Sequence, residues 1–425
     1  MASQMLQEVN LLDLLVFEKG VPHHWFKVLR QEAPVYWHPD PETGDGFWVL
    51  TKYHDLVQVS MDTQTFSSAQ GITLATLEFF PSQNLMMITT DPPRHTRLRR
   101  LVSHGFTPKM ISLLEPDVRR MAGQLLDDAI EKGECDFVTA VAAELPLMVI
   151  ARFLGVPQED RHQIFRWSNQ ILGAGDPEYG GIDLQRPPET EEERQALIEH
   201  FRQVVAGAAM EMAAYLQRLE EERLRAPKDD LVSIYLHAQV DGEKLSMLER
   251  HAQFVLLAVA GNETTRNAIS GGLLALLQHP DQLELLRQDP SLIPMAVEEI
   301  LRYVSPVMYM RRTATKDAEI RGMTIKAGQR ITMWYVSANR DEEVFPEPDR
   351  FDVTRQPNDH VAFGAGGPHF CLGANLARLE IRVLLEELLA RPYEVEVAGP
   401  VQRLRSNFIN GIKHMPVRFR RRKVA

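Results

Sequence analysis

The sequence predicts a mostly α-helical protein with a small β region. Helical periodicity runs almost without interruption from residue 113 to about 237, and the longest helical pattern follows at residues 248–278. Residues 35–37 and 47–50 are rich in β-branched and aromatic side chains and are bounded by turn residues, which predicts short strands. Further short strands are expected after the last helical pattern, which ends near residue 389.

Composition and charge narrow the class of protein. Hydrophobic residues make up 44% of the chain and charged residues 25%, as in an ordinary soluble globular protein. The net charge of −11 argues against a nucleic-acid partner. The two cysteines, Cys135 and Cys371, offer neither a disulfide framework nor a C-x-x-C metal site. With no signal peptide and no membrane-spanning run, we expect a cytoplasmic protein without stable membrane insertion, working as a monomer.

A glycine-rich stretch around Cys371 carries the strongest chemical signal. Residues 363–373 read F-G-A-G-G-P-H-F-C-L-G, and a helical pattern begins at residue 374. Glycine permits positive φ and close approach of a flat ligand. A cysteine just before a helix N-terminus lies near unpaired N–H groups, which favour the thiolate. An isolated cysteine is more often a small inert hydrophobe, but a thiolate in such a loop suits an axial ligand of iron.

This stretch resembles the haem-binding signature of cytochrome P-450, F-G-x-G-x-H-x-C-x-G. It departs by one residue, because residues 367–368 stand where the family has a single residue before the histidine. The resemblance implies that Cys371 is the axial ligand of the iron in haem b. It also implies that Phe363, Gly364 and His369 contact the cofactor.

The centre of the longest helical pattern has an unusual composition for a buried helix. Residues 260–265 read A-G-N-E-T-T; glycine costs roughly 1 kcal/mol there relative to alanine, and threonine can bond back to the i−4 carbonyl. Small residues serve either a helix–helix crossing or a groove for a small ligand. The stretch resembles the family's A-G-x-[D/E]-T-T oxygen-binding motif. That resemblance places Ala260 and Gly261 at the cofactor and makes Thr264 and Glu263 the catalytic proton relay.

Two basic segments are candidates for holding a negatively charged ligand. Residues 91–100 read D-P-P-R-H-T-R-L-R-R; Asp91 is a suitable N-cap, and His95 and Arg99 share one helix face. The simpler interpretation is a solvated basic face. The segment resembles the one that binds haem propionates in the family, which assigns both residues to the cofactor. Arg312, at the start of a predicted strand, matches the family's second propionate-binding arginine.

An E-x-x-R motif has an architectural role by the same resemblance. Glu299 and Arg302 lie three residues apart on a predicted helix, and such a pair on a surface contributes little. In the family the pair is buried and joined by an arginine from a later loop, here matched to Arg350 within residues 345–351. Removing one partner would then leave a buried charge unpaired, at a cost of several kcal/mol.

The expected substrate pocket is apolar. Residues 366–378 and 407–413 look like the actinobacterial branch of the family that hydroxylates steroids and methyl-branched lipids; a terpenoid is an alternative. Apolar walls predict a hydrophobic substrate. The expected walls are Leu74, Leu77, Phe79, Phe80, Val259, Val307, Met308, Phe408 and Ile409.

Five motifs in the family's order, between residues 91 and 373, imply one haem-thiolate monooxygenase domain over residues 1–425, with flexible ends at 1–15 and 419–425. Haem would lie between the 248–278 helix and the cysteine loop. The implied reaction inserts one atom of O₂ into a C–H bond. Because the domain uses the whole chain, electrons are expected from a ferredoxin and its NAD(P)H-dependent reductase.

An acidic ferredoxin would dock against basic residues near the cysteine, for which Arg97, Arg100 and Lys109 are candidates. Two other functions remain open at this point. A peroxide-driven peroxygenase would use the same thiolate without a proton relay, and a non-enzymatic haem or gas sensor would need an output domain.

Overall fold

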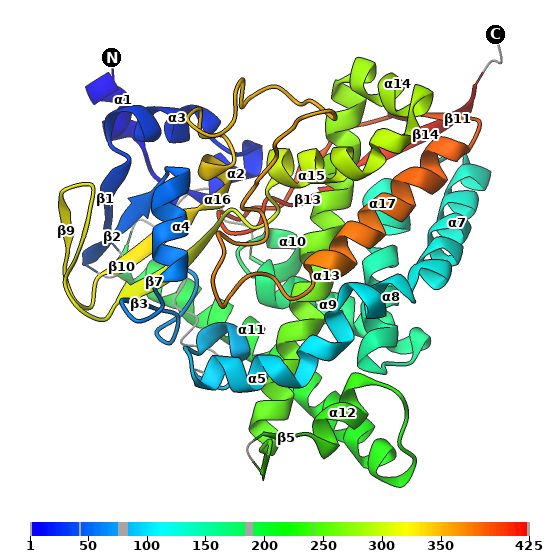
Figure 1. Ribbon diagram of the computed structural model, residues 1–425, viewed down its shortest axis with the longest axis horizontal. Helices are drawn as coiled ribbons and strands as arrows, with labels where there is room; N and C mark the ends of the chain where they lie inside the picture. The colour runs from blue at the N-terminus through cyan, green and yellow to red at the C-terminus, as the bar shows by residue number, and fades with distance from the viewer. Residues whose placement is uncertain (1, 42–43, 75–83, 183–189, 241, 423–425) are drawn as a thin grey trace.

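Long helices form one side of the molecule, and a five-stranded sheet with the N-terminal helices forms the other (Figure 1). This computed structural model describes residues 2–41, 44–74, 84–182, 190–240 and 242–422. The predicted fold class, mostly α with a small β region, is confirmed. The α-helices are α1 Ala2–Glu8, α2 Leu14–Lys19, α3 His23–Glu32, α4 Tyr53–Met61, α5 Arg94–Ser103, α6 Pro108–Ser112, α7 Glu115–Lys132, α8 Glu144–Leu154, α9 Arg161–Leu172, α10 Pro177–Gly180, α11 Glu191–Arg225, α12 Leu231–His237, α13 Met247–Gln278, α14 Pro280–Gln288, α15 Ile293–Val304, α16 Tyr335–Ala338 and α17 Ala374–Ala390.

Fourteen strands lie within the described ranges, and most of them are short. They are β1 Val35–Asp40, β2 Asp45–Leu50, β3 Phe66–Ser67, β4 Glu134–Asp136, β5 Gln239–Val240, β6 Glu243–Lys244, β7 Tyr309–Ala314, β8 Ala318–Ile320, β9 Met323–Ile325, β10 Arg330–Trp334, β11 Tyr393–Val397, β12 Gln402–Arg403, β13 Ile412–His414 and β14 Pro416–Arg421. Short 3₁₀ turns occur at Met87–Thr89, His104–Phe106, Gln158–Asp160 and Pro290–Leu292, and a π-helical turn at Val138–Ala142.

Helix α13 crosses the middle of the helical part (Figure 1). It starts in a capping box, in which the Ser246 hydroxyl accepts the N–H of Glu249 and the Glu249 carboxylate accepts the N–H of Ser246. It packs against α8, α9, α15 and α17, so apolar residues surround most of its circumference. The helix predicted at residues 248–278 is confirmed to within one residue at its start.

The main sheet brings a basic strand into the interior. Its strand order is β1-β2-β10-β7-β3; β2 and β10 run parallel and the other neighbours antiparallel. Strand β7 carries Arg312, which lies opposite Ile331 of β10. Only 3% of Arg312 is exposed. The predicted strands at 35–37 and 47–50 correspond to β1 and β2.

The ends of the chain differ from the flexible segments expected at 1–15 and 419–425. Leu11 is fully buried, between α1 and α2. Near the other end, β14 pairs with both β11 and β4, and Phe419 is 6% exposed. Most of both described ends is therefore part of the fold, because their apolar side chains are removed from water.

Candidate active site

Glycines and a backbone hydrogen bond shape the loop that carries the cysteine. The N–H of Cys371 donates to the carbonyl oxygen of Phe363 at 2.9 Å. Gly364, Gly366 and Gly367 have φ values of 99°, 86° and 78°, a region that residues with a Cβ rarely adopt. The loop therefore folds back on itself and brings the two ends of the predicted signature together, directly before α17.

The surroundings of the thiol suit a thiolate ligand. Part of the Cys371 residue is accessible to solvent. Many protein atoms nevertheless lie around its sulfur, and this burial raises the pKa of the thiol. The backbone N–H of Gly373 and the charges of Arg99 and Arg378 act in the opposite direction and lower that pKa. These donors and charges would stabilise the thiolate once a metal ion has displaced its proton.

The extra residue of the signature packs against two helices. The Ser60 hydroxyl, near the end of α4, donates to the carbonyl oxygen of Gly366 at 2.8 Å. A Cβ on Gly367 would overlap the backbone oxygen of Ser60, so only glycine fits there. On the other side, Arg99 of α5 donates to the carbonyl oxygen of Pro368 at 3.1 Å. The insertion thus anchors the loop to α4 and α5.

A cluster of imidazoles and guanidiniums lies beside the loop. The rings of His95 and His369 have their centroids 4.3 Å apart. Burial, together with the charge of Arg99, lowers the pKa of His95 to about 4. Burial, with the charges of Arg312, His95 and Arg99, lowers the pKa of His369 to about 2. The structure therefore brings together His95, Arg99 and Arg312, the three residues predicted to hold the propionates, and places His369 of the cysteine loop beside them.

These residues fit a ligand with carboxylates. Both ring nitrogens of His95 and the Nε of Arg312 are buried and have no hydrogen-bond partner among the described residues. Buried polar groups nearly always have partners, so the cluster matches a ligand that accepts hydrogen bonds and carries negative charge. The two propionates of haem b supply both. Cys371 would then bind the iron, and His95, Arg99, Arg312 and His369 would hold the propionates.

The carboxylate of Asp91 does not cap α5, contrary to the prediction. It accepts the backbone N–H of Ser68 at 2.8 Å and the hydroxyl of Ser67. The Ser68 hydroxyl in turn lies 3.2 Å from Nε2 of His369. Asp91 therefore ties the chain after β3 to the start of α5, next to the histidine cluster. The sequence offered no signal for these two serines.

One face in the middle of α13 is open. Ala260 is exposed and Gly261 and Thr264 are partly exposed, although the other residues from 257 to 268 are buried. The Thr264 hydroxyl donates to the carbonyl oxygen of Ala260 at 2.9 Å, which is the i−4 bond predicted from the sequence. The helix thus presents a fixed hydroxyl and a small side chain one turn apart, an arrangement that leaves room for a small ligand.

Glu263 lies on a different side of α13. It is 1% exposed and forms an ion pair with Arg266, whose guanidinium also donates to the Asn169 side chain of α9 at 3.0 Å. The amide of Asn267 lies 3.4 Å from the same carboxylate. A role in proton transfer therefore requires Glu263 to turn away from Arg266.

Gly261 serves a helix crossing. A Cβ at this position would lie 2.7 Å from Cδ1 of Ile150 in α8, so any larger residue would force the Ile150 side chain to move. The two helices pack on each other here. Of the two interpretations of the small residues, the helix crossing holds for Gly261, which is also partly exposed, and Ala260 lies on the open face. The cofactor contacts of both residues stay predictions.

The predicted pocket walls separate into two groups. Val307 and Phe408 are partly buried, and Leu74 and Val259 are 7% and 8% exposed. Met308 and Ile409 are each 1% exposed, so they belong to the packed core and are wrong as pocket walls. The remaining predicted walls lie outside the described residues: Leu77, Phe79 and Phe80.

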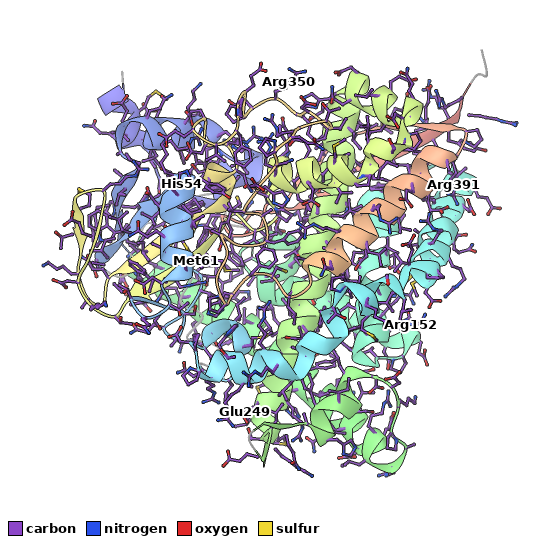
Figure 2. The ribbon with its side chains drawn as sticks, viewed as in Figure 1. His54, Met61, Arg152, Glu249, Arg350 and Arg391 are labelled. Carbon is purple, nitrogen blue, oxygen red and sulfur yellow. The ribbon has the colours of Figure 1, made fainter. Side chains whose placement is uncertain are left out.

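The predicted E-x-x-R pair is present, but its third member is a different arginine. Glu299 and Arg302 are both fully buried and 2.8 Å apart. Arg355 completes the group, with its Nε 3.2 Å from Glu299 and 8% of its side chain exposed. Arg350 was the wrong choice: it lies at the rim of the molecule (Figure 2), its side chain is 57% exposed, and it pairs with Glu347.

The reason for this error lies in the backbone of residues 345–355. The carbonyl oxygen of Arg350 accepts hydrogen bonds from Arg302 at 3.1 Å and from Arg355 at 3.0 Å. The loop thus passes close to the pair at residue 350 but turns that side chain outward. Two arginines five residues apart in one irregular loop gave no periodic signal by which to choose.

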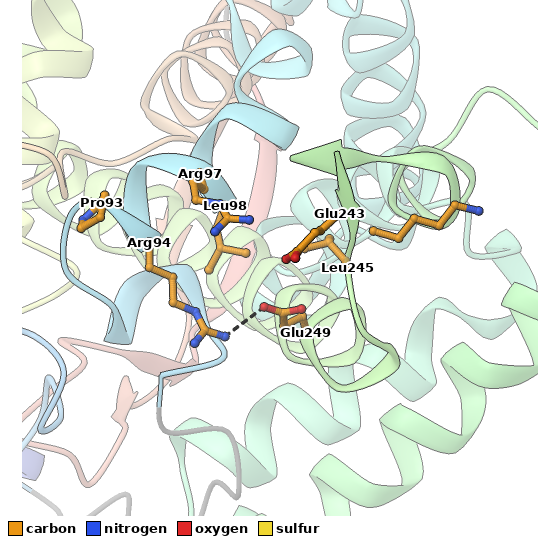
Figure 3. A pocket seen from close by; sticks show the side chains of 8 residues that line it. Pro93, Arg94, Arg97, Leu98, Glu243, Leu245 and Glu249 are labelled. Carbon is orange, nitrogen blue, oxygen red and sulfur yellow. Dashed lines mark hydrogen bonds and ion pairs between the residues drawn. The ribbon is translucent and has the colours of Figure 1, made fainter. Parts of the chain in front are cut away.

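The three basic residues predicted to dock a redox partner differ in their surroundings. Arg100 and Lys109 are exposed. Arg97 instead lines a cavity of about 310 Å³ between α5 and the start of α13 (Figure 3). There, Arg94 and Glu249 form an ion pair at 2.9 Å. This cavity contains residues of both charges and none of the predicted haem contacts.

Fold and site define a haem-thiolate protein: a cysteine in a glycine loop, an imidazole and guanidinium cluster for carboxylates, and a long helix with an open face. The cytochrome P450 family model matches residues 10–415. The chain belongs to the cytochrome P450 family, and its cofactor is haem b.

Several known members resemble this chain closely. A steroid C26-monooxygenase of Rhodococcus jostii is 41% identical, over 95% of this chain and 83% of that protein. A methyl-branched lipid omega-hydroxylase of Mycobacterium tuberculosis is 43% identical, over 96% and 94% of the two chains. The solved structure of Mycobacterium marinum cytochrome P450 CYP268A2 with pseudoionone is 37% identical, with a TM-score of 0.83 and coverage of 93% and 94%. The chain is an oxidoreductase of the monooxygenase type. No helix within the described ranges could cross a bilayer.

Proposed function

We propose that this enzyme hydroxylates a hydrophobic small molecule of the steroid or methyl-branched lipid class. One oxygen atom of O₂ enters a C–H bond, and the other is reduced to water, which consumes two electrons and two protons. The unpartnered ring nitrogens of His95 and Nε of Arg312, buried beside the cysteine loop, carry the haem assignment. The names of the two similar proteins above support the substrate class, and the mostly apolar candidate walls agree with it. A terpenoid remains the alternative substrate.

Each part of the site then has a task. Bound haem supplies oxygen activation, with the thiolate ligand donating electron density to iron. His95, Arg99, Arg312 and His369 fix its orientation through the propionates. The chain in turn orients the substrate and limits the access of water.

Thr264 is the proposed proton relay. Its hydroxyl can hold a water molecule at the open face of α13 while remaining bonded to the Ala260 carbonyl, and it can pass protons as a general acid–base group. Glu263, on a different side of α13, can supply protons to that water if its side chain breaks the ion pair with Arg266 and turns toward the open face. This assignment makes Thr264 the more direct participant and Glu263 the second.

Replacing the hydroxyl tests the relay. Thr264→Ala should lower product formed per NAD(P)H consumed about tenfold or more, since a positioned proton donor contributes on the order of 10²-fold or more to such steps. Thr264→Ser retains the hydroxyl and should stay within about threefold of wild type. Full coupling in Thr264→Ala would contradict the relay. Turnover with peroxide that exceeds turnover with ferredoxin would favour a peroxygenase instead.

A titration tests the substrate class. The purified ferric protein is mixed with a cholesterol-type steroid, a methyl-branched fatty acid and a monoterpenoid, and the Soret band is followed. A shift to high spin with the steroid or the fatty acid is expected, because an apolar ligand displaces the water on iron. A shift with the monoterpenoid alone would overturn the proposed class.

We also propose that electrons come from a ferredoxin with an NAD(P)H-dependent reductase, and that the enzyme is cytoplasmic. Arg100 and Lys109 are exposed: Arg100 follows Arg99, which contacts the cysteine loop, and Lys109 lies in α6, which packs against α17. Met110 and Leu113 beside them are 45% and 64% exposed. Exposed apolar and basic residues in one segment of the chain suit an acidic protein partner. Cys135, the cysteine not assigned to iron, forms no disulfide, in keeping with a reducing compartment.

A further inference from the structure

An arginine of α17 lies over the aromatic ring of the cysteine loop. The guanidinium carbon of Arg378 is 4.6 Å from the ring centre of Phe363. Phe363 is also the residue whose carbonyl oxygen accepts the N–H of Cys371. The cation of Arg378 therefore contacts the side chain of the residue whose backbone is hydrogen-bonded to Cys371. Part of the Arg378 side chain is shielded from water there.

A carboxylate of α15 fixes this arginine. Glu298 accepts two parallel hydrogen bonds from Arg378, Nε to Oε1 at 2.7 Å and Nη2 to Oε2 at 2.8 Å, which is the strong bidentate geometry. His360 adds a contact, with its Nε2 3.1 Å from Oε2 of Glu298 and its ring centre 5.9 Å from that of Phe363.

Glu298 is ionised in this arrangement. Burial alone would raise the pKa of its carboxyl, but the hydrogen bonds from His360 and Arg378 outweigh burial and lower that pKa to about 2. The pair thus consists of full opposite charges, with 34% of the Arg378 side chain and 29% of the Glu298 side chain exposed. Only the arginine contacts Phe363 with its charged group.

We propose that Glu298 and Arg378 are a positioning pair that sets the reduction potential of the thiolate-bound iron, with Arg378 supplying a positive charge next to the loop and Glu298 holding it there. This rests on the assignment of Cys371 as the iron ligand. Reduction of iron by one electron adds a negative charge to the iron–thiolate unit. A nearby cation stabilises that reduced state and an anion destabilises it.

A merely structural role, in which the pair ties α15 to α17, predicts a different result from single substitutions. Arg378→Gln leaves the Glu298 carboxylate near the loop, so the reduction potential should fall. Glu298→Gln leaves the Arg378 charge uncompensated, so the potential should rise. We expect roughly a fivefold change in the reduction equilibrium in each direction, about 40 mV at 59 mV per tenfold for one electron.

The experiment is a spectroelectrochemical titration of the substrate-free holoenzyme, with both variants and with Arg378→Lys. Arg378→Lys retains the charge without the fork, so its potential should lie closer to wild type than that of Arg378→Gln. Opposite shifts in the two glutamine variants support the proposal. Shifts of the same sign, no shift in either, or a lysine variant as low as Arg378→Gln would overturn it.

A carbon monoxide spectrum of the reduced wild-type protein separates this inference from the assignment beneath it. A red-shifted Soret band, as expected of a thiolate ligand, keeps Cys371 as the iron ligand whatever the potentials show. If that band is missing from wild type, the assignment of Cys371 itself fails. If the band is present and the potentials do not move, only the role of the Glu298–Arg378 pair fails.

Discussion

Removing the buried carboxylate of Glu299 should destabilise the fold by about 3–5 kcal/mol, the usual cost of leaving a buried charge without its partner. The carboxylate accepts two hydrogen bonds from Arg302, both at 2.8 Å, and the backbone N–H of Asp352 at 2.9 Å. Asn358 donates to it at 3.1 Å. Glu299→Gln retains the volume but leaves the guanidinium of Arg302 buried and uncompensated. Since whole proteins are stable by roughly 5–15 kcal/mol, this loss is a large fraction of the total.

Two arginines of the neighbouring loop give a matched comparison. Arg355 pairs with Glu299 at 3.2 Å and its side chain is 8% exposed, whereas Arg350 is 57% exposed. Arg355→Gln should therefore cost about 1–3 kcal/mol, the cost of leaving a buried hydrogen-bonding group unsatisfied. Arg350→Gln should change the free energy of unfolding by less than about 0.5 kcal/mol, as surface substitutions usually do.

The assay is urea denaturation of the holoenzyme and its three variants, followed by both circular dichroism and haem absorbance. Two probes are needed because a bound cofactor can break two-state behaviour. The expected order of destabilisation is Glu299→Gln, then Arg355→Gln, then Arg350→Gln. The reasoning is refuted if Arg350→Gln destabilises as much as Arg355→Gln, or if Glu299→Gln unfolds like wild type.

Two further predictions concern the surface of the molecule. His414 lies 2.6 Å from Asp136 and 3.2 Å from Glu178; burial lowers its pKa, but these carboxylates outweigh burial and the pKa is raised. The stabilisation from this histidine is full below its unfolded pKa of about 6.5 and is lost as the pH rises through its folded pKa. His414→Gln should therefore be destabilised by up to about 1 kcal/mol near pH 6 and not at all near pH 9. Urea midpoints measured across this pH range check the prediction, and a difference that is constant with pH would contradict it. In stopped-flow measurements, Lys109→Glu should slow ferredoxin-supported reduction severalfold at low salt and little at high salt. Lys228 is exposed on the loop after α11, and Lys228→Glu should leave the rate unchanged. Equal effects of the two substitutions would rule out docking at Lys109.

Local patterns predicted the helical part of the fold well. The 248–278 helix matches α13, and the helix after the cysteine loop matches α17, because a long amphipathic or apolar period is visible without knowledge of its partners. Both short strands near the N-terminus were also found. The cap of α5 was not, because the carboxylate of Asp91 bonds to Ser67 and Ser68, which are distant in sequence from the helix.

The errors at the site have one physical origin. By residue type, Gly261 suits a groove and a helix crossing equally well, and only the contact with Ile150 of α8 shows the crossing. The apolar character of Met308 and Ile409 predicts pocket walls, but burial in the core satisfies an apolar side chain equally well. In each case the sequence gives the type of side chain and the tertiary contact decides its use.

The sequence by itself determined the order of the helices and the cysteine with its glycine loop, since these depend on residue type and short spacing. It also predicted which imidazole and guanidinium groups would hold an anionic cofactor, through resemblance to family motifs. Only the tertiary structure decided which arginine meets Glu299, where Glu263 turns, and that Arg378 lies over Phe363. Arg355 and Glu299 are 56 residues apart, and Asn169, which binds the Arg266 partner of Glu263, is 97 residues from that arginine. The strength of these contacts depends on burial and distance, and neither is encoded in any local pattern.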